Sequence, residues 1–92
     1  MHTFLVCFDI SDDKSRRELG DCLSEYGVRV QRSVFEIAVD SLAQLQTLKQ
    51  ALKPYVEADD DLRFYHLCRH CRQQSLSLDE QRIAQFPAWV VV

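Results

Sequence analysis

The feature that most constrains the fold of this chain is an apolar run near the N-terminus, residues 4–11. Its alternation and length are those of a β-strand that is buried on both faces, or nearly so, until it reaches Asp9. Residues 11–13 (Ser-Asp-Asp) follow, and each can cap a helix. We therefore expect a core strand that passes directly into a helix, with Asp9 at the junction. Position alone favours a solvated or turn-capping aspartate, although a carboxylate there can also bind a hard cation.

The size of the chain limits what it can do alone. It has 92 residues and a formal net charge of -3, which predicts one domain, residues 1–92, and a marginal monomer that gains from dimerisation. The charge gives no general attraction to nucleic acid, so a nucleic-acid surface must be local. With no secretory signal or membrane-spanning run in the sequence, we expect a cytoplasmic protein whose four cysteines are reduced and which does not bind membranes.

Periodicity predicts the first half of the fold. Residues 12–26 carry one apolar helical stripe, and Gly27 is placed as a glycine just after the helix C-terminus. Residues 28–39 read as a long strand whose alternation changes phase within 31–34, which predicts a bulge or bend. The sequence leaves open whether this segment is one strand or a hairpin.

The second half begins with a helix. Ser41 and Gln44 have capping-box spacing and open an apolar helical stripe, and Pro54 should loosen its last turn. We expect residues 59–61 to be a solvated polar turn, residues 62–68 to be a strand and residues 73–77 to be a connection. Residues 78–85 fit a helical turn or an extended segment, and the apolar residues 88–92 fit a terminal strand.

This order of elements predicts an α+β fold, a ferredoxin-like βαββαβ sandwich with both helices on one sheet face. We expect an additional C-terminal strand within residues 83–92, including Trp89, that pairs with a sheet edge of the same or the partner subunit.

Two blocks of the sequence resemble the second family of CRISPR-associated (Cas) proteins, the small subunit of the spacer-acquisition complex. The first is Phe-Asp-Ile-Ser-Asp-Asp-Lys at residues 8–14, followed by Arg16 and Arg17. The second, at residues 27–36, is Gly-Val-Arg-Val-Gln-Arg-Ser-Val-Phe-Glu. Their spacing and the chain length also fit, so the resemblance covers nearly the whole chain.

The resemblance implies a ferredoxin-like homodimer that holds a magnesium ion, or manganese, between its two copies of Asp9. It implies either metal-dependent endonuclease activity on RNA or double-stranded DNA, or a DNA-binding bridge between two integrase dimers. Two departures stand out: Phe8 replaces a tyrosine often found before the aspartate, and the net charge is negative.

Four polar residues are candidates for nucleic-acid contacts: Arg16, Arg17, Arg29 and Ser33. The arginine guanidinium matches phosphate geometry, although a solvated helix face or strand edge explains the same residues. Phe35 is a candidate core or dimer residue rather than a base-stacking one, and Trp89 is assigned to the same group.

The segment 66–71 (His-Leu-Cys-Arg-His-Cys) has zinc-ligand chemistry. It lacks a second Cys-x-x-Cys, and strand geometry separates its histidines. We interpret these residues as structural cysteines, with redox or zinc roles as the alternative.

The leading hypothesis is therefore a CRISPR adaptation protein, both metal-dependent endonuclease and DNA-binding subunit, in which Asp9 is catalytic and metal-binding. The alternatives are a non-catalytic scaffold that bridges integrase dimers and a ferredoxin-like regulatory module.

Overall fold

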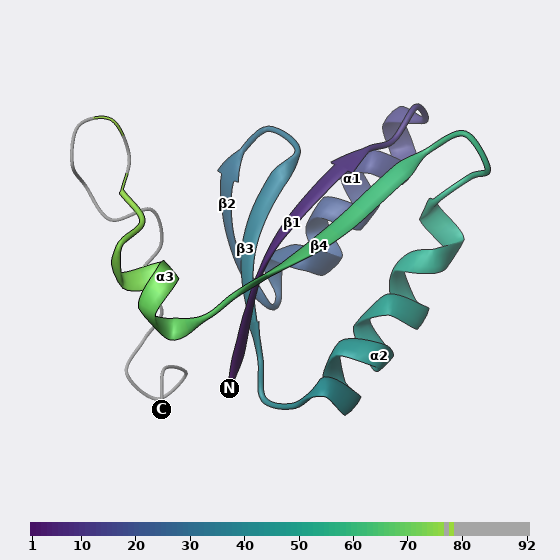
Figure 1. Cartoon of the computed structure of the whole chain (residues 1–92). Helices are drawn as coiled ribbons and strands as arrows, with labels where there is room; N and C mark the ends of the chain where they lie inside the picture. The colour runs from purple at the N-terminus through teal and green to yellow at the C-terminus, as the bar shows by residue number, and fades with distance from the viewer. Residues whose placement is uncertain (77, 79–92) are drawn as a thin grey trace.

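The chain forms a four-stranded antiparallel sheet with the two long helices on one of its faces (Figure 1). The computed structural model describes residues 1–76 and 78. In chain order the elements are β1 (His2–Asp9), α1 (Asp13–Ser24), β2 (Gly27–Gln31), β3 (Val34–Val39), α2 (Leu42–Leu52), the 3-10 turn η1 (Lys53–Tyr55), β4 (Asp61–Leu67) and α3 (Arg69–Gln73). The strand order β2-β3-β1-β4, with helices after β1 and β3, confirms the expected ferredoxin-like fold.

β1 is an inner strand, paired with β3 on one side and β4 on the other. Because successive side chains of a strand point to opposite faces, Phe4, Val6 and Phe8 are buried under the helices. Cys7, on the other face, is half-buried, and Asp9 is exposed. The expected apolar strand that ends at a carboxylate is confirmed, but the face that carries Leu5 and Cys7 is less buried than expected.

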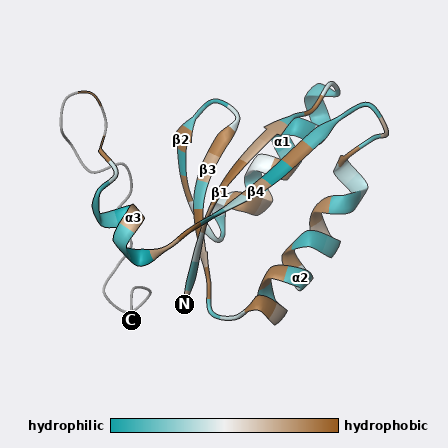
Figure 2. Ribbon diagram, in the orientation of Figure 1, coloured by the Kyte–Doolittle hydropathy of each residue, from teal (hydrophilic) through white to brown (hydrophobic). Residues whose placement is uncertain are grey.

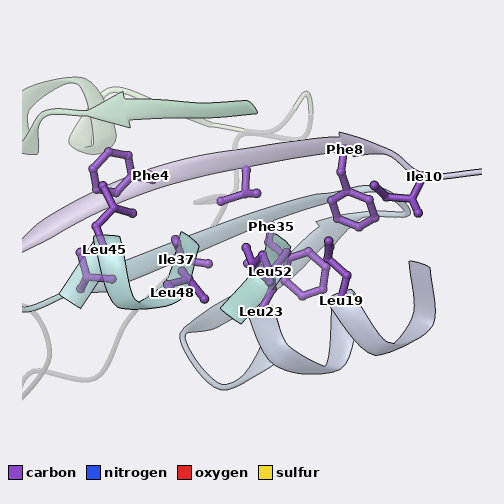
Figure 3. Packing of buried hydrophobic residues seen from close by; sticks show 12 residues of the cluster. Phe4, Phe8, Ile10, Leu19, Leu23, Phe35, Ile37, Leu45, Leu48 and Leu52 are labelled. Carbon is purple, nitrogen blue, oxygen red and sulfur yellow. The ribbon is translucent and has the colours of Figure 1, made fainter. Parts of the chain in front are cut away.

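The core lies between the sheet and the long helices, as Figure 3 shows. Phe8 stacks on Phe35 with 6.1 Å between ring centroids, and Leu19 of α1 and Leu52 of α2 pack beside them. Hydrophobic and hydrophilic residues alternate along α2 (Figure 2), and the buried ones are Leu45, Leu48 and Leu52. The buried cluster consists of Phe4, Val6, Phe8, Ile10, Leu19, Leu23, Phe35, Ile37, Val39, Leu45, Leu48 and Leu52.

Gly27 does not have the role predicted for it. α1 begins after the N-cap Asp12 and ends at Ser24, and Gly27 is the first residue of β2. A Cβ atom at Gly27 would lie 1.9 Å from the Glu36 carbonyl oxygen of β3. Glycine is therefore required by the close approach of two strands and not by a helix terminus.

The phase change within residues 31–34 marks a hairpin. β2 and β3 are separate strands joined by a turn at Arg32 and Ser33, and their register shifts between Arg29 and Gln31. The predicted irregularity is confirmed.

The rest of the chain has one expected and one unexpected feature. Ser41 caps α2 by accepting from the Gln44 backbone N–H at 3.1 Å. Pro54 lies in η1, so the predicted loosening at the end of α2 is confirmed.

The sequence does not predict the short helix α3, because its five residues are too few for periodicity to reveal. The expectations for residues 79–92, including the strand within 83–92 and Trp89, lie outside the described residues. Within the described part of the chain, no helix is long and apolar enough to cross a membrane.

We predict opposite effects of alanine at two glycines. Gly27→Ala should lower the free energy of unfolding by at least about 2 kcal/mol, because the methyl group meets backbone atoms of β3. Gly20→Ala, inside α1, meets only the movable Nη2 end of Arg29 at 2.7 Å, and helix propensity favours alanine there by up to about 1 kcal/mol. Urea unfolding of both variants at equal protein concentration measures the difference. Equal destabilisation would contradict the assigned role of Gly27.

Candidate functional site at the end of β1

Asp9 lies at one end of the sheet, on the face away from α1 and α2. We call this face, which carries Leu5, Cys7 and Asp9 of β1, the open face. Asp61, the first residue of β4, lies directly across from Asp9, and both are exposed. The end of β1, the start of β4 and the β2–β3 turn gather here (Figure 1).

The β2–β3 turn is joined to β1 at this end. The Phe8 backbone N–H donates to the Ser33 carbonyl oxygen at 3.1 Å. Ser33 is half-buried and Arg32, its neighbour, is exposed. The turn is therefore fixed one residue from Asp9.

Arg16 braces the connection that follows Asp9. Its Nη1 donates to the Ile10 carbonyl oxygen at 2.9 Å, and its Nη2 pairs with Asp13. Ile10 is buried at 2% exposure, so the chain is fixed immediately after Asp9. Arg16 thus has a structural role that its helical position did not reveal.

Asp60 joins the loop before β4 to the same connection. Its Oδ1 accepts from the Ser11 backbone N–H and from Ser11 Oγ, both at 3.0 Å, and its Oδ2 accepts from the Glu57 N–H at 2.9 Å. The donation from Glu57 and then from Ser11 lowers the pKa of Asp60. The expected polar turn is present at residues 58–59, but it does not extend over 59–61, because Asp60 is a tertiary contact and Asp61 begins β4.

The remaining sequence candidates are not all close to Asp9. Arg17 is exposed on α1. Arg29 lies on the helix-covered side of β2, with its Cζ 5.1 Å from the Phe35 ring centroid, and Phe35 is fully buried. The structure therefore places Ser33 and Arg16 near Asp9, and Arg29 on the opposite face.

β4 supplies polar residues that sequence reasoning missed. Arg63 Nε donates to Asp61 Oδ2 at 2.8 Å, and its Nη1 donates to Tyr65 Oη at 3.4 Å. The ferredoxin-like order predicts that the end of β1 meets the start of β4, but only the register reveals that Asp61 is the partner of Asp9.

The open face combines apolar side chains with one buried carboxylate. Val28 and Tyr65 are 44% and 47% exposed, and their register partners Glu36 and Leu5 place them on this face. Glu36 is only 3% exposed. Burial raises its pKa, and the charge of Arg72 on α3 opposes that rise.

Metal-ligand chemistry is limited within one chain. Among residues 1–76 and 78, no group of three His, Cys, Asp or Glu side chains is placed to hold an ion. The zinc alternative for residues 66–71 therefore finds no support in the described geometry. Each chain offers one carboxylate from Asp9, and Asp61 lies across from it. Carboxylate oxygens are suitable ligands for a hard cation such as magnesium.

These features define a class: ferredoxin-like α+β domains with an exposed carboxylate where the first strand ends. Residues 1–75 match the family described as CRISPR associated protein Cas2. A relative from Synechocystis sp., named CRISPR-associated endoribonuclease Cas2 3, is 35% identical over the full length of both chains.

Two solved structures are also similar to this chain. A chain of the structure named "Partial Cas6-RT-Cas1--Cas2 complex" matches with a TM-score of 0.81 and 33% identity over all of both chains. Streptococcus pyogenes Cas2 matches with a TM-score of 0.73 and 29% identity, over 83% of this chain and 98% of that one. The chain belongs to the CRISPR-associated Cas2 family.

We predict that Asp60→Asn lowers stability at neutral pH, because the neutral amide is a weaker acceptor for the Ser11 and Glu57 donors. The folded-state pKa of Asp60 lies below its unfolded value of about 3.9. Its stabilisation is therefore present above that value and is lost as pH falls through the folded pKa. The parent and the variant should converge in strongly acidic solution.

The matched control is Asp59→Asn in the same exposed loop, which should change stability little. Thermal unfolding from neutral to acid pH measures both variants. A difference for Asp60→Asn that stays constant with pH would contradict this assignment.

Proposed function

We propose that this protein is a metal-dependent endonuclease and DNA-binding subunit of CRISPR adaptation that acts as a homodimer beside an integrase. The observation that carries the proposal is the position of Asp9, an exposed carboxylate at the end of an inner strand. Hydrogen bonds to Ile10, Ser11 and Phe8 hold the chain on both sides of it. Such a held carboxylate suits a catalytic site, which needs its groups fixed before substrate binds.

The open face supports the homodimer. α1 and α2 cover the other side of the sheet, whereas Val28 and Tyr65 are exposed beside Leu5 and Cys7 on this side. A second copy related by a two-fold axis buries the same apolar surface of both chains. It also adds a second Asp9 to an ion site for which one chain has too few ligands.

The residues fit magnesium or manganese in this arrangement. Two Asp9 carboxylates would contribute oxygen ligands and negative charge, and water and phosphate would supply the remaining ligands, as these ions prefer. Bound there, the ion supplies positive charge to polarise the scissile phosphodiester. The chain itself orients Asp9 through the Arg16 and Asp60 contacts and presents Arg32 and Ser33 beside it.

The substrate and the partner are proposed from the relatives. The Synechocystis protein is named an endoribonuclease, and the similar complex contains Cas2 together with Cas1, as its name states. We propose a phosphodiester of RNA or of duplex DNA as substrate and the CRISPR integrase as partner. We propose as a second candidate function a non-catalytic DNA scaffold between integrase dimers, for which the association of Cas2 with Cas1 named in that complex is the supporting observation.

We predict that Asp9→Asn reduces magnesium- or manganese-dependent cleavage at least about 100-fold, since loss of a direct ligand exceeds the 10–100-fold typical of outer-shell changes. The amide keeps the shape of the carboxylate and removes its charge. Cleavage of single-stranded RNA and of duplex DNA by purified protein is the measurement, with Asp59→Asn as the matched control.

Two outcomes would decide against catalysis by Asp9. Cleavage at the parent rate in a folded Asp9→Asn dimer would remove Asp9 from the mechanism. If parent protein that binds duplex DNA and the integrase cleaves neither substrate with either metal, the scaffold function stands instead.

We predict that duplex affinity falls with rising salt, and that replacing one phosphate-contacting arginine lowers the salt slope by about one. Arg32→Ala is the test variant because Arg32 is exposed in the β2–β3 turn next to Asp9. Arg69→Ala, at the other end of the sheet, is the control. Fluorescence anisotropy across a salt series measures the slope, and a salt-independent affinity would contradict phosphate binding.

A further inference from the structure

Two exposed cysteines meet at the junction between β4 and α3. Cys68 is the N-cap of α3, and its Sγ accepts from the Cys71 backbone N–H at 3.2 Å. The Cys68 carbonyl oxygen also accepts from the Arg72 N–H at 3.0 Å, which completes the first turn. This turn places two thiols three residues apart on one side of the helix start.

The surroundings of the pair favour a thiolate. Arg69, His70 and Arg72 follow within the same helix, whose first turn has no acidic residue. Hydrogen bonding to the Cys71 side chain and then to its backbone N–H lowers the pKa of Cys68, whereas the same contact raises the pKa of Cys71. Cys68, whose Sγ accepts the Cys71 backbone N–H, is therefore the thiol whose thiolate form is favoured, and Cys71 lies next to it in the same turn.

The two remaining cysteines lie in less exposed surroundings. Cys7 and Cys22 are half-buried. Burial and then the charge of Glu25 raise the pKa of Cys22. Because the thiolate is the reactive form, these cysteines provide internal references for reactivity.

We propose that Cys68 and Cys71 are a reactive dithiol site for thiol–disulfide exchange, in which Cys68 is the nucleophile and Cys71 resolves the intermediate. The co-reactant is a low-molecular-weight disulfide. The Cys68 thiolate attacks one of its sulfurs, forms a mixed disulfide and expels one thiolate. Cys71, after losing its proton, attacks Cys68 Sγ and expels the second thiolate. The protein loses two electrons to the disulfide, which becomes two thiols.

This site is separate from the candidate site at Asp9. β4 runs from Asp61, across from Asp9, to Leu67, across from Thr3 near the start of β1, so the dithiol follows the opposite end of the strand. It lies beside the charge of Arg72, which acts on the buried Glu36. A disulfide would fix the start of α3 to the end of β4 without involving Asp9.

The experiment treats the full reduced protein with oxidised glutathione and follows each cysteine by peptide mass spectrometry. We expect Cys68 to react at least about tenfold faster than Cys22, because Cys68 is exposed and accepts a backbone N–H whereas Cys22 is half-buried. The parent should end with a Cys68–Cys71 disulfide. Cys71→Ser should instead accumulate glutathione on Cys68, because the resolving thiol is gone.

Cys68→Ser is the matched variant, since serine is a favoured N-cap and preserves the first turn of α3. It should abolish the fast reaction while thermal stability stays close to the parent value. Reaction of Cys71 at the parent rate in this variant would overturn the assignment of the nucleophile. Equal rates at Cys7, Cys22 and Cys68, or a mixed disulfide that persists in the parent, would overturn the dithiol site.

Discussion

The structure depends on the two-sided pairing of β1. Its position between β3 and β4 fixes which side chains enter the core and which face away. Phe4, Val6 and Phe8 anchor the sheet to both long helices. The same alternation directs Asp9 to the open face, so core packing and the placement of the candidate site follow from one strand.

Two sets of polar contacts fix the position of the chain just after Asp9. Arg16 holds the Ile10 carbonyl from α1, and Asp60 holds Ser11 from the loop before β4. Arg16 is near in the sequence and Asp60 is 49 residues away, yet the two side chains hold consecutive residues. A loop held in this way keeps Asp9 in place at little entropic cost when a ligand binds. The fold and the candidate site are therefore coupled through backbone groups rather than through Asp9 itself.

Local patterns are enough to predict the helices α1 and α2, the irregularity near Ser33 and the strand that ends at Asp9. They are insufficient wherever the cause is a contact between distant segments. Sequence alone assigns Gly27 to a helix terminus because the approach of β3 across the sheet leaves no local signal. It assigns Asp60 to a solvated turn because the partner Ser11 is 49 residues away. It groups Arg29 with the other arginines by charge, yet register places Arg29 over a core phenylalanine on the covered face.

Central to the proposed function is that two open faces meet and would bring two copies of Asp9 to one shared ion. The most direct measurement is the stoichiometry of manganese binding to the purified protein, by titration with electron paramagnetic resonance, alongside sedimentation at the same concentrations. The account predicts one ion for every two chains in a dimer, with binding lost in Asp9→Asn. One ion per chain, or the same binding by a monomer, would contradict it.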